Sequence, residues 1–223
     1  MSSSGHRALG ALIAKYKLLN GMGFDTYSKC YETSVCPVID YGGEVLGYLK
    51  SQKLDTVQNK AMRVFLGVHR FAANAAVSGD MGWYPGIIRR KIRMLRYWNR
   101  LTTLPDDRIT RTVFVYDIEK GGKWSQSIKR ILREIDQVQL FENKVQIDLK
   151  EAKELLMENF KLSWEKLVTK KPKLRTYKQF KTKCETDKYV TLNLERNQRS
   201  VLAQLRAGIL HLQIELGRFT NIK

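Results

Sequence analysis

The chain has 223 residues, of which 43% are hydrophobic and 10% aromatic, a composition that excludes an intrinsically disordered protein. Forty Lys and Arg residues stand against 22 Asp and Glu residues, so the formal net charge is +18 and a polyanionic partner is expected, with nucleic acid the first candidate and an anionic membrane surface the second. No apolar run approaches the ~20 residues of a membrane-spanning helix, so we expect no partner in the membrane.

The N-terminal segment allows two interpretations. It is basic and has no acid before Asp25, which is typical of a transit peptide. Its apolar residues also follow the period of a core-facing helix that ends at Gly21, and we favour this second interpretation. The residues of that apolar face are Leu9, Leu12, Ile13, Tyr16 and Leu19.

The remaining elements are predicted to be mainly helical. Ser51 is suited to cap a helix that ends near Gly67, and further helices are predicted from about 86 to 101 and from about Ser125. Asp148 and Glu151 resemble a capping box at the start of a long helix. A last helix is predicted to bury the apolar residues Val201, Leu202, Leu205 and Ile209.

Only residues 111–117 show a strand pattern, and they could equally belong to a helix that begins after Pro105. We therefore expect an all-α fold with at most minor β structure. The glycine pair at 121–122 is the best candidate for a boundary. It predicts two packed helical lobes, one over 1–120 that contains the arginine-rich helix and a basic one over 121–223.

The cysteines and histidines indicate neither a disulfide framework nor a zinc site. The three cysteines, Cys30, Cys36 and Cys184, are an odd and sparse set, which suits a reducing compartment. The histidines His6, His69 and His211 lie far from one another in sequence. We expect a protein of the nucleus or cytoplasm that binds no metal.

Two blocks carry most of the excess positive charge. Residues 60–100 hold nine Lys and Arg against one acid, Asp80, and residues 161–183 hold nine against Glu165. In the first block, helical spacing places Arg89, Arg93, Arg96 and Arg100 in one stripe opposite an apolar face. A stripe of one sign, made of arginine, favours contacts to a phosphate backbone over a solvated face.

The second block is "KKPKLRTYKQFKTK", in which lysine predominates. Tyr177 and Phe180 follow Leu174 at helical spacing and are expected in the core rather than as platforms for bases. "KKPK" also resembles a nuclear import signal. Of the aromatic pair before Pro85, we expect Trp83 in the core, and Tyr84 either in the core or stacked on a base. The candidate nucleic-acid-binding residues are Arg63, Arg70, Tyr84, Arg89, Arg90, Arg93, Arg96, Arg100, Lys170, Lys171, Lys173, Arg175 and Lys178.

No motif for catalysis is present. The sequence has no glycine-rich phosphate loop, no GxSxG, no HExxH and no CxxC. Its one acidic doublet, Asp106-Asp107, lies between Pro105 and Arg108, where it suits a helix start rather than a pair of metal ligands. We expect no catalytic residue and no cofactor.

Several segments of the chain resemble non-LTR retrotransposon reverse transcriptases of invertebrates. They are "LDTVQNKAMRVFLGVHRFAANAAVSGDMGW", "RRKIRMLRYWNRL", "TYSKCYETSVCPVIDYGGEVLGY" and "PKLRTYKQFKTKCETDKYVTLNLERNQRSVLAQLRAGIL". The resemblance covers essentially the whole chain, with 138–160 the least distinctive. It departs from the usual pattern at Leu46, Ala73, Ala207 and His211.

The resemblance implies a place in the thumb and helical connector of such a polymerase, downstream of the palm that holds the catalytic aspartates. In that place the chain would bind RNA or an RNA–DNA hybrid without sequence preference, would catalyse nothing by itself, and would have the rest of the polymerase as a partner. Two alternatives stay open: a helical scaffold that binds proteins, and a non-functional relic of an element.

Overall fold

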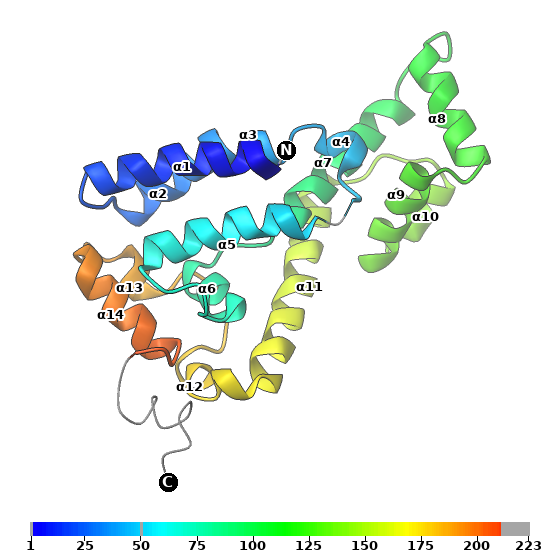
Figure 1. The fold of residues 1–223 in the computed structure, drawn as a ribbon. Helices are drawn as coiled ribbons and strands as arrows, with labels where there is room; N and C mark the ends of the chain where they lie inside the picture. The colour runs from blue at the N-terminus through cyan, green and yellow to red at the C-terminus, as the bar shows by residue number, and fades with distance from the viewer. Residues whose placement is uncertain (1, 50, 211–223) are drawn as a thin grey trace. The chain divides into compact units, whose positions relative to one another are not determined.

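The structure is a computed structural model that describes residues 2–49 and 51–210, and within these ranges it contains helices and no β-strand (Figure 1). The predicted all-α fold is confirmed. Residues 111–117, for which a strand was the alternative, lie within α8 (Ile109–Glu119). No helix in this part of the chain is both long and apolar enough to span a lipid bilayer. His211 lies outside the described residues.

The chain forms two compact units, and each is assembled from separate stretches of sequence. Unit 1 comprises 2–39, 52–84 and 161–210 of the described residues, and unit 2 comprises Asp40–Ser51 and Pro85–Phe160. This division differs from the expected boundary at 121–122. Gly121, with φ of +63°, turns the chain tightly between α8 and α9, and the Gly122 amide donates to Asp117 O at 2.7 Å. The glycine pair therefore closes a helical hairpin inside unit 2.

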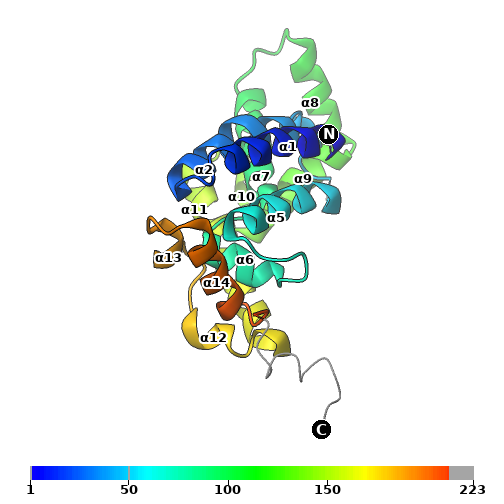
Figure 2. The same ribbon diagram turned by 60° about the vertical axis from the view of Figure 1, so that its left-hand side comes forward.

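Unit 1 begins with two helical layers. α1 (Ser2–Leu18) is followed by α2 (Phe24–Cys30), which continues through a π-helical turn, η1 (Tyr31–Val35), into α3 (Cys36–Ile39). α5 (Gln52–Leu66) lies beside α1 and is followed by α6 (Asn74–Met81), as Figures 1 and 2 show. The N-terminal segment is thus a core-facing helix, although Leu19 of its predicted apolar face is 56% exposed.

The C-terminal part of unit 1 consists of short helices. It starts with the second part of α11 (Leu149–Lys170), whose residues up to Phe160 belong to unit 2. There follow η2 (Pro172–Leu174), α12 (Tyr177–Phe180), α13 (Lys188–Thr191) and α14 (Arg196–Arg206). Tyr177 is buried as expected, but Phe180 is 62% exposed because the chain turns extended at Lys181.

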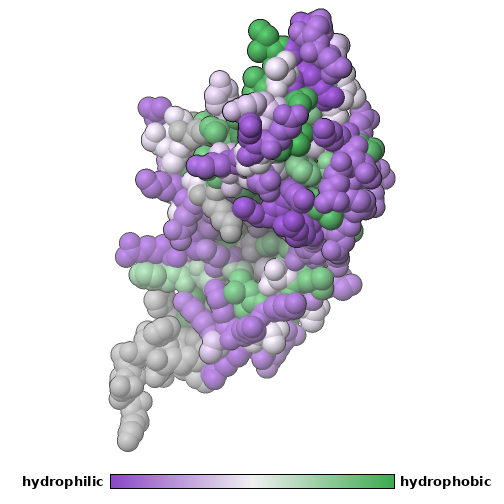
Figure 3. Space-filling model, turned by 90° about the vertical axis from the view of Figure 1, so that its right-hand side faces the viewer, coloured by the Kyte–Doolittle hydropathy of each residue, from purple (hydrophilic) through white to green (hydrophobic). Residues whose placement is uncertain are grey.

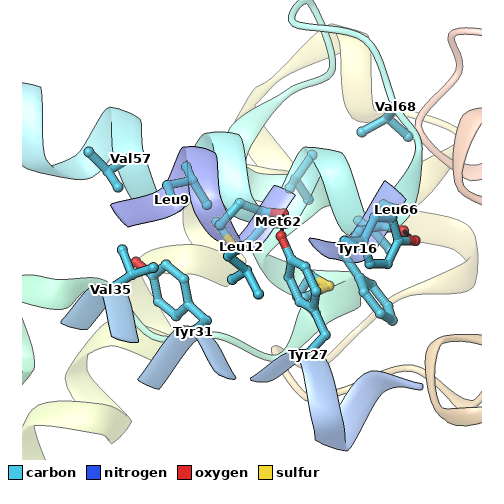
Figure 4. Packing of buried hydrophobic residues seen from close by; sticks show 14 of the residues in the cluster. Leu9, Leu12, Tyr16, Tyr27, Tyr31, Val35, Val57, Met62, Leu66 and Val68 are labelled. Carbon is cyan, nitrogen blue, oxygen red and sulfur yellow. Dashed lines mark hydrogen bonds between the residues drawn. The ribbon is translucent and has the colours of Figure 1, made fainter. Parts of the chain in front are cut away.

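The core of unit 1 is built around aromatic residues from α1, α2 and α5 (Figure 4). Tyr16, Tyr27 and Phe65 are fully buried, and the Tyr16 and Tyr27 ring centroids lie 5.2 Å apart in an edge arrangement. The Tyr27 hydroxyl donates to Ala61 O at 2.9 Å, and burial raises the pKa of Tyr27 well above its usual range. Trp83 stacks on Tyr31 with centroids 4.6 Å apart, so its predicted place in the core is confirmed.

The last helix turns a different side to the core from the one predicted, although Ile209, just beyond its end, packs against the core as expected. Val201 and Leu205 are 52% and 49% exposed, whereas Arg199 and Ala203 are buried. The Arg199 guanidinium donates to Phe65 O at 3.0 Å and to the Tyr16 hydroxyl at 2.7 Å, and it lies 4.1 Å from the Phe65 ring centroid. A guanidinium with fixed acceptors and an aromatic face can be buried, so it decides which side of α14 faces the core.

Unit 2 is a group of helices around Trp98. Its elements are α4 (Gly43–Leu46), α7 (Gly86–Thr102), α8, α9 (Lys123–Glu134), α10 (Val138–Glu142) and the first part of α11. The Trp98 ring stacks on Phe141 at 5.1 Å and meets the edge of Phe114 at 5.3 Å. Asp148 caps α11 as predicted, since its Oδ1 accepts from the Lys150 amide at 2.7 Å.

Candidate nucleic-acid interface

α7 carries the arginine stripe and begins and ends within one residue of the prediction. Its apolar residues Met94, Leu95 and Trp98 are fully buried in unit 2, so the helix has one fixed inner face. The helix starts directly after Pro85, whose ring favours the extended entry to a helix. The orientation of the arginines follows from this burial, but their surroundings depend on residues far away in the sequence.

Three of these arginines gather around a single buried carboxylate, Asp40, which is 1% exposed. Arg89 Nε donates to Asp40 Oδ2 at 2.8 Å, and Arg90 NH1 lies 3.3 Å from Oδ1. Arg93 NH1 donates to the Asp40 backbone oxygen at 2.9 Å. The repulsion between arginines at helical spacing is therefore relieved by an acid that lies about 50 residues earlier in the chain.

This arrangement divides the candidate arginines of α7, which are Arg90 and the four of the predicted stripe, into two groups. Arg90, a candidate for phosphate contact, is 4% exposed and is a structural residue of unit 2. Arg89 and Arg93 are half-buried and bonded to Asp40. Arg96 and Arg100 are exposed, and neither pairs with an acid in the part of the chain that is described. Only these last two can meet a phosphate without giving up a contact.

A cavity of about 360 Å³ lies at the end of α7 and includes one of these two arginines. Arg100 and Arg108 supply positive charge, Tyr97 an aromatic side and Thr110 a hydroxyl, and the remaining lining is Leu101, Leu104 and Pro105. Arg108 is exposed, and it has no acidic partner among the described residues. Arg108 therefore extends the basic surface that Arg96 and Arg100 form in unit 2 beyond the end of α7.

The second basic block lies in unit 1 and is almost entirely exposed. Its candidate residues Lys170, Lys171, Lys173, Arg175 and Lys178 are all exposed. None of them pairs with an acid in the described ranges. The segment is held by two buried side chains, Leu174 and Tyr177, which point inward between the exposed cations.

Lys181 belongs to this block in sequence but not in surroundings. It is 8% exposed and donates to Asp187 Oδ2 at 3.2 Å and to Glu185 O at 2.7 Å. It is therefore a structural residue.

The other three candidates have different roles. Arg63 is half-buried and donates to Ala72 O at 3.0 Å and to Asn74 Oδ1, while burial lowers its pKa, so it is structural. Arg70 is exposed, with its guanidinium carbon 4.8 Å from the Phe71 ring centroid. Tyr84 is half-buried, and its carbonyl accepts from Gln58 Nε2 at 2.7 Å.

Asp80, the single acid of the first block, is the centre of a buried polar cluster in unit 1. It accepts from the Tyr177 hydroxyl at 2.9 Å, the Tyr189 hydroxyl at 2.7 Å and Arg206 NH2 at 3.1 Å. Burial raises the pKa of Asp80, and Arg206 opposes that rise. Both of its oxygens are occupied and it is 2% exposed, so its role is to hold α12, α13 and α14 to α6 rather than to react.

Gly79 in the last turn of α6 and Gly82 at its C-cap lie on either side of Asp80, and both are closely packed. A Cβ on Gly79 would lie 2.4 Å from Trp164 Cζ2, and one on Gly82 would lie 2.3 Å from the Thr186 amide nitrogen. Gly82 also has φ of +63°. The end of α6, from Gly79 to Gly82, is therefore a packing site in unit 1.

Sequence reasoning missed Asp40 and Phe71 near the candidate residues. Asp40 gave no local signal, because its partners are about 50 residues away. Phe71 is 63% exposed directly beside Arg70, and an aromatic residue next to a cation in a turn was a signal that could have been used.

The described residues contain no group of three or more His, Cys, Asp and Glu side chains that could hold a metal ion. Comparisons of the chain with known protein families, with curated proteins and with solved structures found no match. The surface itself therefore carries the functional interpretation. Figure 3 shows one face of the molecule, on which hydrophilic side chains predominate and hydrophobic ones form small separate groups.

Proposed function

We propose that this chain binds nucleic acid, RNA or an RNA–DNA hybrid, through phosphate contacts and without reading base sequence. It catalyses no reaction itself, and it originates from the thumb and connector of a non-LTR retrotransposon reverse transcriptase. The origin is supported by the sequence resemblance alone.

One observation carries the proposal for binding. Residues 166–184 contain eight Lys and Arg residues and no acid, and the five candidate cations among them are exposed without an acidic partner in the described structure. Solvated protein surfaces usually mix both signs, so an exposed run of one sign is suited to a polyanion. Phosphates are the groups that such a run contacts, and these contacts carry no base information.

The test is a fluorescence-anisotropy titration of RNA, an RNA–DNA hybrid and duplex DNA over a series of salt concentrations. Five phosphate contacts predict that log K falls with log salt at a slope of roughly −3 to −5. The test variant replaces Lys170, Lys171, Arg175 and Lys178 with Gln and leaves Lys173, whose Nζ donates to Phe71 O at 2.8 Å. The control variant, with the same change in net charge, replaces the exposed residues Lys15, Lys144, Lys150 and Lys153 with Gln.

If the proposal holds, the test variant loses affinity and has a flatter salt slope, whereas the control variant stays close to the parent. Equal losses in both variants would reduce the binding to net charge alone. A parent chain that binds none of the three nucleic acids would refute the proposal.

A second candidate function, binding to a protein, is favoured by the surface of α8. Ile109, Val113 and Tyr116 follow helical spacing and are 83%, 60% and 61% exposed. The proposed occupant is the upstream part of a polymerase of the resembled family. Replacing Ile109 and Val113 with Ser would then abolish association in sedimentation velocity and leave RNA affinity unchanged.

A further inference from the structure

The chain between α5 and α6 forms a loop (Figure 2). It contains three consecutive exposed residues, His69, Arg70 and Phe71. The residues on either side, Val68 and Ala72, are buried at 8% and 3% exposure. The Phe71 ring is left 63% exposed, although removing an aromatic ring from water is favourable. The loop therefore holds an aromatic ring in solvent between two anchored residues.

The backbone of this loop is held by four hydrogen bonds. The Val68 amide donates to Arg63 O at 3.1 Å, and the Ala72 amide donates to His69 O at 3.0 Å. Arg63 NH2 donates to Ala72 O at 3.0 Å, and Lys173 Nζ donates to Phe71 O at 2.8 Å. Because the bonds lie on both sides of Phe71, the ring projects from a fixed backbone, which lowers the entropy that a ligand must offset on binding.

The ring is surrounded by groups that suit a negatively charged ligand. The Arg70 guanidinium carbon lies 4.8 Å from the Phe71 centroid, and the His69 ring lies 4.9 Å away at an interplanar angle of 53°. Lys173 connects this loop to the exposed basic block. The sequence between Asp55 and Asp80 contains no acid, so no carboxylate of this segment opposes the charge.

We propose that Phe71 stacks on an unpaired base of single-stranded nucleic acid, while Arg70 and Lys173 contact the phosphates beside that base. The inference rests on the proposed function and adds a preference for single strands. Every base has an aromatic face, so stacking tolerates any sequence, but a paired base in a duplex already has neighbours on both faces. An apolar pocket of a partner protein would accept the Phe71 ring equally well, but binding in such a pocket would not require the cations around the ring.

The experiment compares the full chain with Phe71→Leu and Phe71→Trp. The ligands are an oligouridylate single strand, the same strand with abasic positions, and its hybrid duplex with DNA. Phe71→Leu keeps an apolar side chain at an exposed position and removes the aromatic face. Circular dichroism melting checks that both variants fold like the parent.

We expect Phe71→Leu to weaken single-strand binding by roughly 5- to 100-fold. Duplex affinity and the salt slope should stay within about twofold of the parent, because the phosphate contacts remain. Phe71→Trp should retain single-strand affinity. The abasic strand should bind the parent more weakly than the intact strand, and it should bind Phe71→Leu as well as the intact strand does.

Two results would overturn the inference without touching the proposed function. They are an unchanged single-strand affinity in Phe71→Leu, and equal losses on single strand and duplex. A parent chain that binds neither ligand would instead refute the proposed function, and this inference with it.

Discussion

Replacing Asp40 with Ala tests whether the arginine stripe of α7 is structural at its N-terminal end. The change removes the carboxylate that accepts from Arg89 at 2.8 Å and faces Arg90 at 3.3 Å. The Arg90 side chain is 5% exposed, whereas that of Arg89 is 35% exposed and can return to water. Breaking a buried ion pair lowers the free energy of unfolding by about 3–5 kcal/mol. Because Arg89 is partly exposed, we expect Asp40→Ala to lower it by about 3 kcal/mol.

The assay is urea unfolding followed by tryptophan fluorescence, since Trp98 and Trp124 both lie in unit 2. Arg90→Met alone and together with Asp40→Ala completes a double-mutant cycle, with an expected coupling above ~1 kcal/mol. The matched control is Asp106→Ala. Asp106 also pairs with an arginine, at 3.3 Å, but its side chain is 95% exposed, so the loss should stay below ~1 kcal/mol.

A loss of less than ~0.5 kcal/mol in Asp40→Ala would contradict this reasoning. Asp40 would then not anchor Arg89 and Arg90, and Arg89, whose side chain is 35% exposed, would again be available for phosphates.

Three further predictions concern other parts of the two units. Replacing Arg96 and Arg100 with Gln should flatten the salt slope of nucleic-acid binding by about 2 and leave the melting temperature unchanged. The reason is that both side chains are exposed and unpaired with acids in the described structure. An unchanged slope would exclude both arginines from the interface. Gly79→Ala should destabilise unit 1 by about 1–3 kcal/mol in urea unfolding, since the added methyl would lie 2.4 Å from Trp164 Cζ2; a neutral result would mean that this contact relaxes freely. Burial raises the pKa of the Cys184 thiol from 9.0 to about 11. The buried neutral thiol therefore contributes fully to the free energy of unfolding below pH 9, and this contribution is lost as the pH rises towards 11. Between pH 8 and pH 11 the free energy of unfolding of Cys184→Ala should therefore fall by about 2–3 kcal/mol less than that of the parent. Parallel pH profiles of the free energy of unfolding in the two proteins would refute this.

Local patterns were sufficient to predict several of the longer helices of this protein. The period of the apolar residues placed α7 and α5 within one or two residues of their ends. Asp148 was recognised as a cap because capping depends on residues only two and three positions away. The exposure of the 170–178 segment could be expected from its charge, since uncompensated cations are rarely buried.

Local patterns failed where a polar side chain is buried by distant partners. Arg199 takes the inner face of α14 because Phe65 and Tyr16, more than a hundred residues earlier, provide its acceptors. Asp40 withdraws Arg90 from the predicted interface in the same way. The boundary expected at Gly121-Gly122 also differs from the observed division into units. A glycine pair marks a turn, but it does not show whether the helices on its two sides pack against each other.

The sequence by itself determined the helical class of the chain, the extent of its longer helices and the two blocks of positive charge. These properties depend on backbone preferences, on hydrophobic period and on composition, all of which act within a few residues. Only the tertiary structure decided which cations remain exposed and that Phe71 is presented in solvent among them. The burial of a charge depends on acceptors that the fold brings from elsewhere in the chain, so the surface left for a ligand is fixed only when the helices have packed.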